Sequence, residues 1–464
     1  MIVKMLFLFI SFLFLFFINT RTVFAAKKVN YQNAYLKWDG KTSDKDFTGD
    51  TFAALTKTTV YRSEKSPTGF YVTFRYYAPE AKRVQISGDW LFSEKHLSTA
   101  NKAPRIHPNN WYNGCILHTC TRPHALRPVD DMVLNKETGY WFFTIPLPSG
   151  WFTYQFFING EDEVNWNNRV TDPQNPPAEY KPGVENYSIV LLPYDPVKQS
   201  KSPDYSYNGL LDECEQMGDF VFDCVPSKIL GWDAPVGIYT PNGYNPKKKD
   251  GYKYLIIMHG MGGFATNWIS QNCMGNITDN LIARRETEPL IVIMPEMNKS
   301  NGEWAYRYIN YDASLINKPN VEGKVSEAVP YIVNELIPWV EKNYNVSNIP
   351  ENRALAGLSR GGETTFSTYL AYPEKFAYFY CMSHGYKEPD VFNYDYSRKE
   401  LKKPTLAFGF GLFDFGFFDG GAEITMRVLS DAGIDFTTNY ALGGHRPDVW
   451  RDCYIDLLRR VLWK

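Results

Sequence analysis

The strongest constraint on the fold is a change of hydrophobic period partway along the chain. Between residues 70 and 195, apolar side chains recur at every second position, which is typical of half-buried β-strands. Turns rich in Gly, Pro and Asn separate these runs. The pattern predicts a small antiparallel β-sandwich. The alternating residues are Val72, Phe74, Tyr76, Val84, Ile86, Trp141, Phe143, Ile145, Leu147, Phe152, Tyr154, Phe156 and Ile158.

A polar connector begins near residue 196, and beyond it apolar strands alternate with helical stretches. This alternation predicts an α/β region, and the near-continuous apolar runs fit a sheet that is covered on both faces. Strands are expected at 236–241, 254–260, 290–296, 354–359, 376–383 and 404–410. Helices are expected over 325–343 and after Ser359, Gly420 and Pro447.

A chain of 464 residues exceeds what one hydrophobic core usually serves. We therefore predict a multidomain protein, with a β-sandwich module in residues 26–200 and an α/β domain in residues 201–464. The formal net charge of −2 provides no basic excess, so we expect neither nucleic acid nor a membrane as a partner. The oligomeric state stays open.

The first 25 residues predict a secretory signal peptide. Lys4 precedes an apolar run at 5–18 that is too short to span a membrane, and residues 23–25 have the small-residue spacing of a cleavage site. We expect cleavage near Ala25 and a secreted mature chain, either extracellular or periplasmic.

An insertion at 91–138 interrupts the sandwich pattern. Its segment 107–124 carries Cys115 and Cys120 among three of the seven histidines, so a disulfide-stapled loop and a metal site are the two alternatives. An oxidising compartment favours the disulfide, and we expect no metal and no cofactor. Cys214 and Cys224 form a second close pair, and the total of seven cysteines leaves at least one outside such pairs.

Ser359 is the candidate nucleophile. It lies in Gly357-Leu-Ser-Arg-Gly361, which fits the pattern G-x-S-x-G, with an apolar strand before it and an apolar helix after it. In that strand–turn–helix setting the turn exposes the hydroxyl above the edge of a sheet. The competing interpretation is a structural serine in a glycine-rich turn.

A serine nucleophile requires a histidine that takes its proton and a carboxylate that orients the histidine. Downstream of Ser359 the histidines are His384 and His445, and His445 lies in a Gly-Gly-His loop before the last helix, which favours it. For the acid, Asp414 directly follows a strand and is preferred to Asp419. We expect His384 to have a structural role.

Two backbone N–H groups are needed to stabilise the negative charge that develops on an ester carbonyl. Arg360, which follows the nucleophile, is expected to supply one. Met261 is expected to supply the other, because it lies in a Gly-rich loop after a strand, where glycines allow the backbone to approach a substrate closely. His259 is expected to hold that loop in shape.

The C-terminal region carries motifs that occur together in one group of enzymes. They are HGMGGFATNW at 259–268, LIVIMPEM at 290–297, LIPWVEKNYNVSNIPENRALAGLSRGG at 336–362, YPEKFAYF at 372–379, GLFD at 411–414 and GGHRPDVWRD at 443–452. With these motifs, the segment from about 204 to 464 resembles the esterase D-like carbohydrate esterases of family 1. That family includes feruloyl and acetylxylan esterases and the related enterochelin esterases, and the resemblance implies an α/β-hydrolase domain.

Three N-terminal segments carry a second resemblance: YYAPEAKRVQISGDW at 76–90, GYWFFTIPLPSGWFTYQFFING at 139–160 and RVTDPQNP at 169–176. They resemble the early-set immunoglobulin-like modules that precede many of these esterases and are similar to glycogen-binding types. The resemblance implies an all-β immunoglobulin-like sandwich before the hydrolase domain. For the tryptophans of this region the alternatives are a sugar-stacking platform and core packing, and the residues concerned are Trp90, Trp141, Trp151 and Trp166.

The chain departs from the family pattern at two positions. Arg360 stands where many relatives have methionine, and the histidine loop reads GGHRPDVW where relatives often read GGHDW. Neither change removes a predicted catalytic group. Trp268, Trp304 and Tyr308 are the expected contacts for an aromatic acyl group or a sugar.

These features together predict a secreted serine esterase that removes feruloyl or acetyl groups from plant cell-wall polysaccharides such as arabinoxylan, through an acyl-Ser359 intermediate. One alternative is an esterase that acts on a siderophore of the enterochelin type. Another is a carbohydrate-binding protein whose hydrolase domain is inactive.

Overall fold

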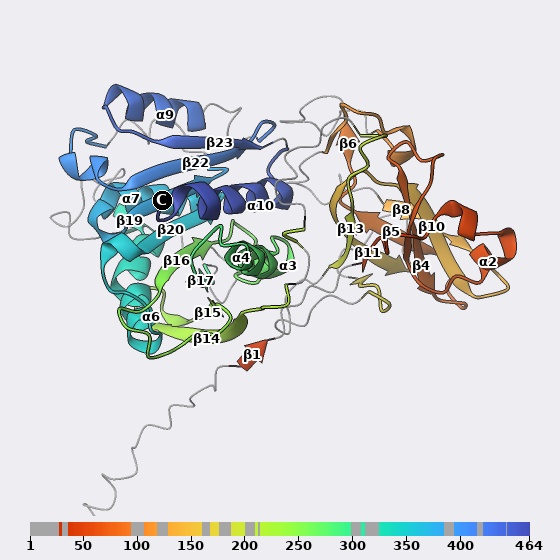
Figure 1. Cartoon of the computed structure of the whole chain (residues 1–464), viewed down its shortest axis with the longest axis horizontal. Coiled ribbons are helices and arrows are strands. Elements are labelled where there is room, and N and C mark those ends of the chain that lie inside the picture. Colours follow the sequence, from red (N-terminus) through yellow and green to blue (C-terminus); the bar gives the residue numbers. More distant parts are fainter. Residues whose placement is uncertain are drawn as a thin grey trace, which may run out of the picture.

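The computed structural model divides into a C-terminal α/β region and an N-terminal β-rich module (Figure 1). The described residues are 27–29, 36–93, 106–117, 129–159, 168–175, 187–199, 209–211, 214–297, 308–310, 324–384, 394–414, 421–441 and 443–464. The predicted signal peptide at 1–25 lies outside them. Within these ranges, no helix has the length and apolar character needed to cross a membrane.

A nine-stranded sheet forms the centre of the C-terminal region. Six neighbouring strands, from β17 to β23 in the order of the sheet, run parallel, and the strands beyond β17 are antiparallel. The sheet order is β1 (Lys27–Val29), β14 (Asp219–Ser227), β15 (Trp232–Thr240), β17 (Leu290–Pro295), β16 (Lys253–Met258), β20 (Arg353–Leu358), β21 (Tyr378–Met382), β22 (Thr405–Gly411) and β23 (Thr437–Ala441).

Helices cover both faces of this sheet, because alternate residues of each central strand face opposite sides. On β16, Leu255 and Ile257 belong to one hydrophobic cluster, whereas Tyr254 and Ile256 belong to another. The first cluster includes α3 (Asn267–Ser270), α4 (Met274–Ala283), α10 (Pro447–Asp456) and the π-helix η11 (Leu457–Val461). The second includes α5 (Ala328–Tyr331), the π-helix η6 (Ile332–Leu336), α6 (Ile337–Asn343), α7 (Arg360–Ala371) and α9 (Gly421–Asp431).

Two sheets pack around one core in the N-terminal module, as the period of two requires. One sheet has the order β3 (Thr59–Arg62), β4 (Phe70–Tyr77), β10 (Tyr140–Pro146) and β9 (Val133–Leu134). The other has β2 (Leu36–Lys37), β13 (Ser188–Leu192), β11 (Gly150–Ile158), β5 (Val84–Gly88) and β8 (Val129–Asp131), with β12 (Arg169–Val170) paired to β11. The short helix α2 (Gly49–Ala53) precedes β3, and β6 (Phe92–Ser93) pairs with β7 (Ile116–Leu117).

The tryptophans of this module are core residues. Trp90, Trp141 and Trp151 are all buried, and Trp90 stacks on Phe74 with ring centroids 5.3 Å apart. These three side chains therefore form no exposed stacking platform. Trp166 lies outside the described residues.

Three sequence expectations need adjustment. The helix expected over 325–343 begins at residue 328, because residues 324–326 form strand β19 (Lys324–Ser326), which pairs with β18 (Tyr308–Asn310). The insertion is shorter than 91–138, because β8 and β9 pair with strands of the two sheets. Cys214 and Cys224 are not joined in a disulfide in the described structure, and Cys224 lies within β14 opposite Pro235.

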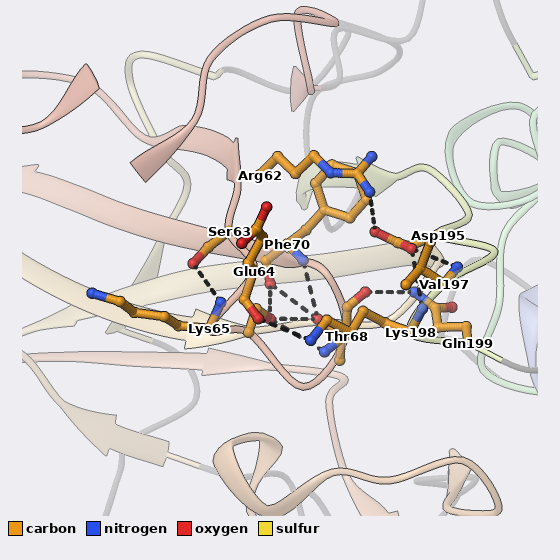
Figure 2. A network of polar contacts seen from close by, with 11 residues as sticks. Arg62, Ser63, Glu64, Lys65, Thr68, Phe70, Asp195, Val197, Lys198 and Gln199 are labelled. Atoms are coloured by element: carbon orange, nitrogen blue, oxygen red, sulfur yellow. Dashed lines mark hydrogen bonds and ion pairs between the residues drawn. The ribbon is translucent and has the colours of Figure 1, made fainter. Parts of the chain in front are cut away.

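A polar network ties the end of the N-terminal module to the turn between β3 and β4 (Figure 2). The buried Asp195 accepts backbone hydrogen bonds from Val197 and Lys198 and forms an ion pair with Arg62, with Nη2 and Oδ2 2.9 Å apart. Gln199 donates to the carbonyl of Thr68. These contacts bind residues 195–199 to the module, close to the predicted boundary at 200.

Strand β1 is an exception to the predicted domain boundary at 200. It precedes the N-terminal module in the chain, yet Lys27, Lys28 and Val29 pair with β14 of the C-terminal sheet. The C-terminal fold therefore includes a strand from residues 26–200 as well as residues 201–464.

Candidate active site

Polar residues gather at one edge of the nine-stranded sheet, because parallel strands share the edge at which they end. Along the chain, β16 leads into His259, β20 into Ser359, β22 into Asp414 and β23 into His445. All four strands belong to the parallel part of the sheet. Residues that are far apart in the sequence are thus brought to one edge.

Ser359 occupies a strained turn between β20 and α7. Its φ of 54° and ψ of −118° lie outside the regions that non-glycine residues usually adopt. Such a conformation costs on the order of 1–3 kcal/mol and persists where the surroundings enforce it. Here the Ser359 N–H donates to the Met382 carbonyl at 2.8 Å, and its carbonyl accepts from the N–H of Glu363 in α7.

The glycines around Ser359 are required by close packing. A Cβ atom on Gly357 would lie 2.4 Å from the backbone of Gly361, and one on Gly361 would lie 2.6 Å from the carbonyl oxygen of His259. A Cβ atom on Gly260 would come within 3.0 Å of the Ser359 Cβ. The loop after β16 therefore lies directly against the serine turn.

That loop contains a tight turn from Gly260 to Gly263, closed by a 3.0 Å hydrogen bond from the Gly263 N–H to the Gly260 carbonyl. Gly262 has a φ of 72°, as the third residue of a type II turn requires. Met261 is the second residue of this turn, and 50% of its surface is exposed. Arg360 is the first residue of α7, where backbone N–H groups point out of the helix end.

His259 holds the loop, as the sequence predicts. Its Nδ1 lies 2.8 Å from the Gly260 carbonyl, and its Nε2 accepts from the Met297 N–H at 3.0 Å. Glu296 adds a contact at 3.0 Å to Nε2 and accepts from the Ala265 N–H. The histidine is buried and fixes the loop to the end of β17.

The structure brings Asp414 and His445 into contact. The His445 Nδ1 lies 3.1 Å and 3.3 Å from the two carboxylate oxygens, and both residues are buried. A carboxylate only accepts, so Nδ1 donates, and Nε2 lies on the opposite side of the ring. Two backbone hydrogen bonds, from Leu412 to Ala441 and from Phe413 to Gly443, hold the two loops together.

A cavity of about 240 Å³ lies beside the loop that follows β16. Leu358, next to Ser359, lines it together with Trp450, against which His445 packs edge-on at 5.1 Å between centroids. The surroundings of the serine and of the histidine thus meet at one cavity. The other lining residues are Tyr187, His259, Gly260, Met261, Gly262, Gly263, Phe264, Asn267, Gln271 and Asn272.

The prediction that Trp268 contacts substrate is wrong. Its side chain is fully buried and packs against Tyr454, with centroids 5.8 Å apart, in the cluster beneath the sheet. Its neighbour Asn267 faces the cavity instead. Of the other two expected contacts, Trp304 lies outside the described residues, and Tyr308 is described only by its backbone in β18.

The sequence also offered Asp419 as the acid and His384 as a second downstream histidine. Asp414 lies against the imidazole of His445, whereas Asp419 lies outside the described residues. His384 is fully buried and stacks on Phe408 at 5.2 Å. Burial lowers the pKa of His384 to about 3, so this ring is neutral at ordinary pH.

Sequence reasoning missed two aromatic residues of the cavity. Trp450 follows His445 by five residues and donates its indole N–H to the Ser383 hydroxyl at 2.9 Å. Trp450 lies in the same motif as His445, GGHRPDVWRD at 443–452, and this position is a sequence signal that it lines the cavity. Tyr187 comes from the N-terminal module just before β13, and no pattern in the sequence links it to the cavity.

No group of His, Cys, Asp or Glu residues suited to a metal ion occurs in the ranges that the structure describes. Cys120 of the predicted Cys/His insertion lies outside those ranges. The choice between a disulfide and a metal in that insertion stays a prediction.

Comparison with known proteins points to esterases. Residues 227–395 match the family described as "Putative esterase". An endo-1,4-β-xylanase/feruloyl esterase of Xylanibacter ruminicola is 35% identical over 168 residues, which cover 35% of this chain and 21% of that protein. Endo-1,4-β-xylanase Y of Acetivibrio thermocellus is 30% identical over 214 residues, covering 44% of this chain and 17% of that protein. The chain thus spans only about a fifth of the length of these relatives.

A likeness in fold extends further along the chain. The crystal structure of the enterobactin esterase from Shigella flexneri aligns with a TM-score of 0.54 and 14% identity, covering 88% of this chain and 98% of that one. At this identity the likeness concerns the fold alone. The resemblance to esterases inferred from sequence motifs is confirmed, and residues 227–395 are the part of the chain that matches the esterase family.

Proposed function

We propose that this chain is a serine esterase with Ser359 as nucleophile, His445 as base and Asp414 as the residue that orients the base. The observation that carries the proposal is the buried contact between Asp414 and His445 at the sheet edge that also bears the strained Ser359 turn. In this constellation a carboxylate holds the imidazole in the tautomer that accepts the serine proton.

In the proposed reaction, the Ser359 hydroxyl oxygen attacks the ester carbonyl while His445 takes its proton. The negative charge that develops on the carbonyl oxygen is stabilised by the N–H groups of Met261 and Arg360. His445 then gives the proton to the leaving alcohol, and an acyl-Ser359 ester remains. Water, activated by the same histidine, hydrolyses that ester and restores the enzyme.

We further propose that the substrates are feruloyl or acetyl esters on plant cell-wall polysaccharides such as arabinoxylan. The matches to a xylanase/feruloyl esterase and to a xylanase support this substrate class. Export of the chain by its predicted signal peptide, with cleavage near Ala25, is part of the same proposal, because polymeric substrates lie outside the cell. The proposed domains are an immunoglobulin-like module and an α/β-hydrolase domain.

The siderophore esterase is the second candidate. The likeness to the enterobactin esterase includes the N-terminal module as well as the hydrolase region, which favours it as the alternative. An inactive carbohydrate-binding protein is less well supported, because the predicted nucleophile, base and acid lie on loops at one sheet edge.

A substrate panel tests the proposal. We expect release of ferulate from methyl ferulate and feruloylated arabinoxylan, or of acetate from acetylxylan, with Ser359→Ala as the inactive control. Hydrolysis of a catecholate siderophore alone would favour the second candidate. No hydrolysis of any of these esters by the folded protein would contradict the esterase proposal.

A further inference from the structure

The histidine loop carries a buried arginine at the point where its sequence departs from the family pattern. Arg446 directly follows His445, and only 5% of its surface is exposed. Its Nε lies 3.0 Å from the Asp448 Oδ1, and its Nη2 lies 3.5 Å from the Asp89 Oδ2. A buried guanidinium needs such carboxylate partners, because loss of hydration is otherwise costly. One of these partners, Asp89, belongs to the N-terminal module.

Asp89 is itself held rigidly. Its Oδ1 accepts the Thr153 N–H at 2.9 Å, and its own N–H donates to the Thr153 carbonyl at 3.2 Å. Thr153 lies inside β11. One carboxylate oxygen is therefore anchored to a sheet of the module, while the other reaches the histidine loop.

The N-terminal module packs against the site independently of this ion pair. Trp151 and Ile189 belong to the same hydrophobic cluster as the core beneath the C-terminal sheet. The Arg451 guanidinium lies over the Trp151 ring at 5.2 Å, and Tyr187 lines the cavity. In Figure 1 the start of α10 points toward the module and the C-terminus lies at the opposite end. Removing the charge of Asp89 therefore leaves the contact between the two regions in place.

We propose that Asp89 is a positioning residue that orients His445 through Arg446. The His445 loop is held from one side by the Asp414 turn and from the other by the N-terminal module. In this proposal the N-terminal module helps to position the catalytic histidine. The inference rests on the proposed function, because it assigns His445 the role of base.

The test compares two identical substitutions in the full chain. Asp89→Asn keeps an acceptor for the Thr153 N–H but removes the charge that faces Arg446. Asp195→Asn is the matched control, because Asp195 also accepts backbone N–H groups and pairs with an arginine, Arg62, but within the module (Figure 2). We expect Asp89→Asn to lower kcat by about 10- to 100-fold with KM within about twofold, since small misplacements of a catalytic group have effects of this size. Asp195→Asn should leave kcat within about twofold.

Arg446→Gln provides a second variant. It removes the contact with Asp448 as well as the contact with Asp89, so it should lower kcat at least as much as Asp89→Asn does. The double variant should lose little more than Arg446→Gln alone, because Asp89→Asn then has no remaining contact with Arg446 to break. Additive losses, equal losses in Asp89→Asn and Asp195→Asn, or an unchanged kcat in Asp89→Asn would overturn the proposal.

Two readouts keep this inference separate from the identity of the substrate. A fluorophosphonate probe reports whether Ser359 is activated, and amide hydrogen exchange over residues 443–450 reports the order of the loop. If the wild type reacts with neither probe nor esters, the proposed function fails. The positioning contact is still tested by exchange: faster exchange in Asp89→Asn than in Asp195→Asn supports it, and equal exchange overturns it.

Discussion

The two regions of this molecule are both rich in β-strands, but their strands run in different directions. In the C-terminal sheet the strands from β17 to β23 run parallel and end at one edge, where Ser359, Asp414 and His445 lie on the loops after β20, β22 and β23. In the N-terminal module the strands are mostly antiparallel, so their ends alternate between two edges. Strand direction thus explains why the C-terminal sheet can bring residues from several loops to one edge, where the proposed site lies.

Because of this difference, we expect substitutions in the two regions to affect different properties, either turnover or stability. Substitutions at the C-terminal sheet edge should change turnover and leave the fold intact, and substitutions in the sandwich core should do the reverse. In our proposal the N-terminal module affects the chemistry through residues that border the cavity and the histidine loop, such as Tyr187 and Asp89.

The largest expected effect is that of Ser359→Ala. Removal of the nucleophile should lower kcat by about 10⁶-fold. The measurement is ester hydrolysis under saturating substrate, with the melting temperature as the control for folding. An unchanged rate would remove Ser359 from the mechanism.

Asp414→Asn should have the next largest effect. An amide no longer stabilises the required tautomer of His445, and the expected loss in kcat is about 10⁴-fold. Asp419→Asn is the matched control and should remain near the wild-type rate. The reverse result would assign the acid to Asp419.

Met261→Pro removes a backbone N–H at a position where proline suits the turn. The second residue of a type II turn favours proline, so the turn from Gly260 to Gly263 should persist. We expect kcat to fall by about 10²- to 10³-fold, the cost of losing one donor to the developing negative charge. Met261→Ala keeps the N–H and should change kcat little. Equal losses of kcat in Met261→Pro and Met261→Ala would show that the Met261 side chain, and not its N–H group, is responsible.

In the N-terminal core, Ile145→Ala should act on stability alone. Ile145 is fully buried on β10, in the sheet that does not contain Thr153. The expected loss is about 2–5 kcal/mol in the free energy of unfolding, measured by denaturant titration. A large fall in kcat of the folded variant would show that the core of the module also affects the site.

The smallest expected effect is a change in acid sensitivity at His384. Burial lowers the pKa of His384 from 6.5 to about 3, so between these values the unfolded chain binds more protons than the folded one. Stability therefore falls as pH falls, by up to about 1.4 kcal/mol per pH unit from this residue. Urea titrations at pH 7, 6 and 5 should show a shallower decline in His384→Leu. An identical decline in both proteins would contradict the burial argument.

Periodicity in the sequence predicts most of the fold. Strands expected at 254–260, 290–296 and 404–410 are present within two residues of their predicted ends, because a fully covered sheet demands continuous apolar runs. The pairing of β1 with β14 was not predictable in this way, because a three-residue strand carries no detectable period.

The site was predictable where backbone geometry restricts residue type. A tight serine turn requires glycines, so the sequence indicates Ser359 and its neighbours directly. Side-chain direction is harder to predict. Asn267 and Trp268 are adjacent in one short helix, yet only Asn267 faces the cavity. The contacts of Asp89 and Tyr187 depend on how two regions pack, which no local pattern encodes.

Strand β1 has a consequence for how the protein is made. Lys27 leaves the ribosome long before Phe222, the residue opposite it in the sheet, so its segment must wait while the whole N-terminal module is synthesised. A shortened chain that starts at residue 201 would lack this strand and would leave the outer side of β14 open to pairing with other molecules. Attempts to produce the C-terminal region alone should therefore supply residues 27–29 or expect aggregation.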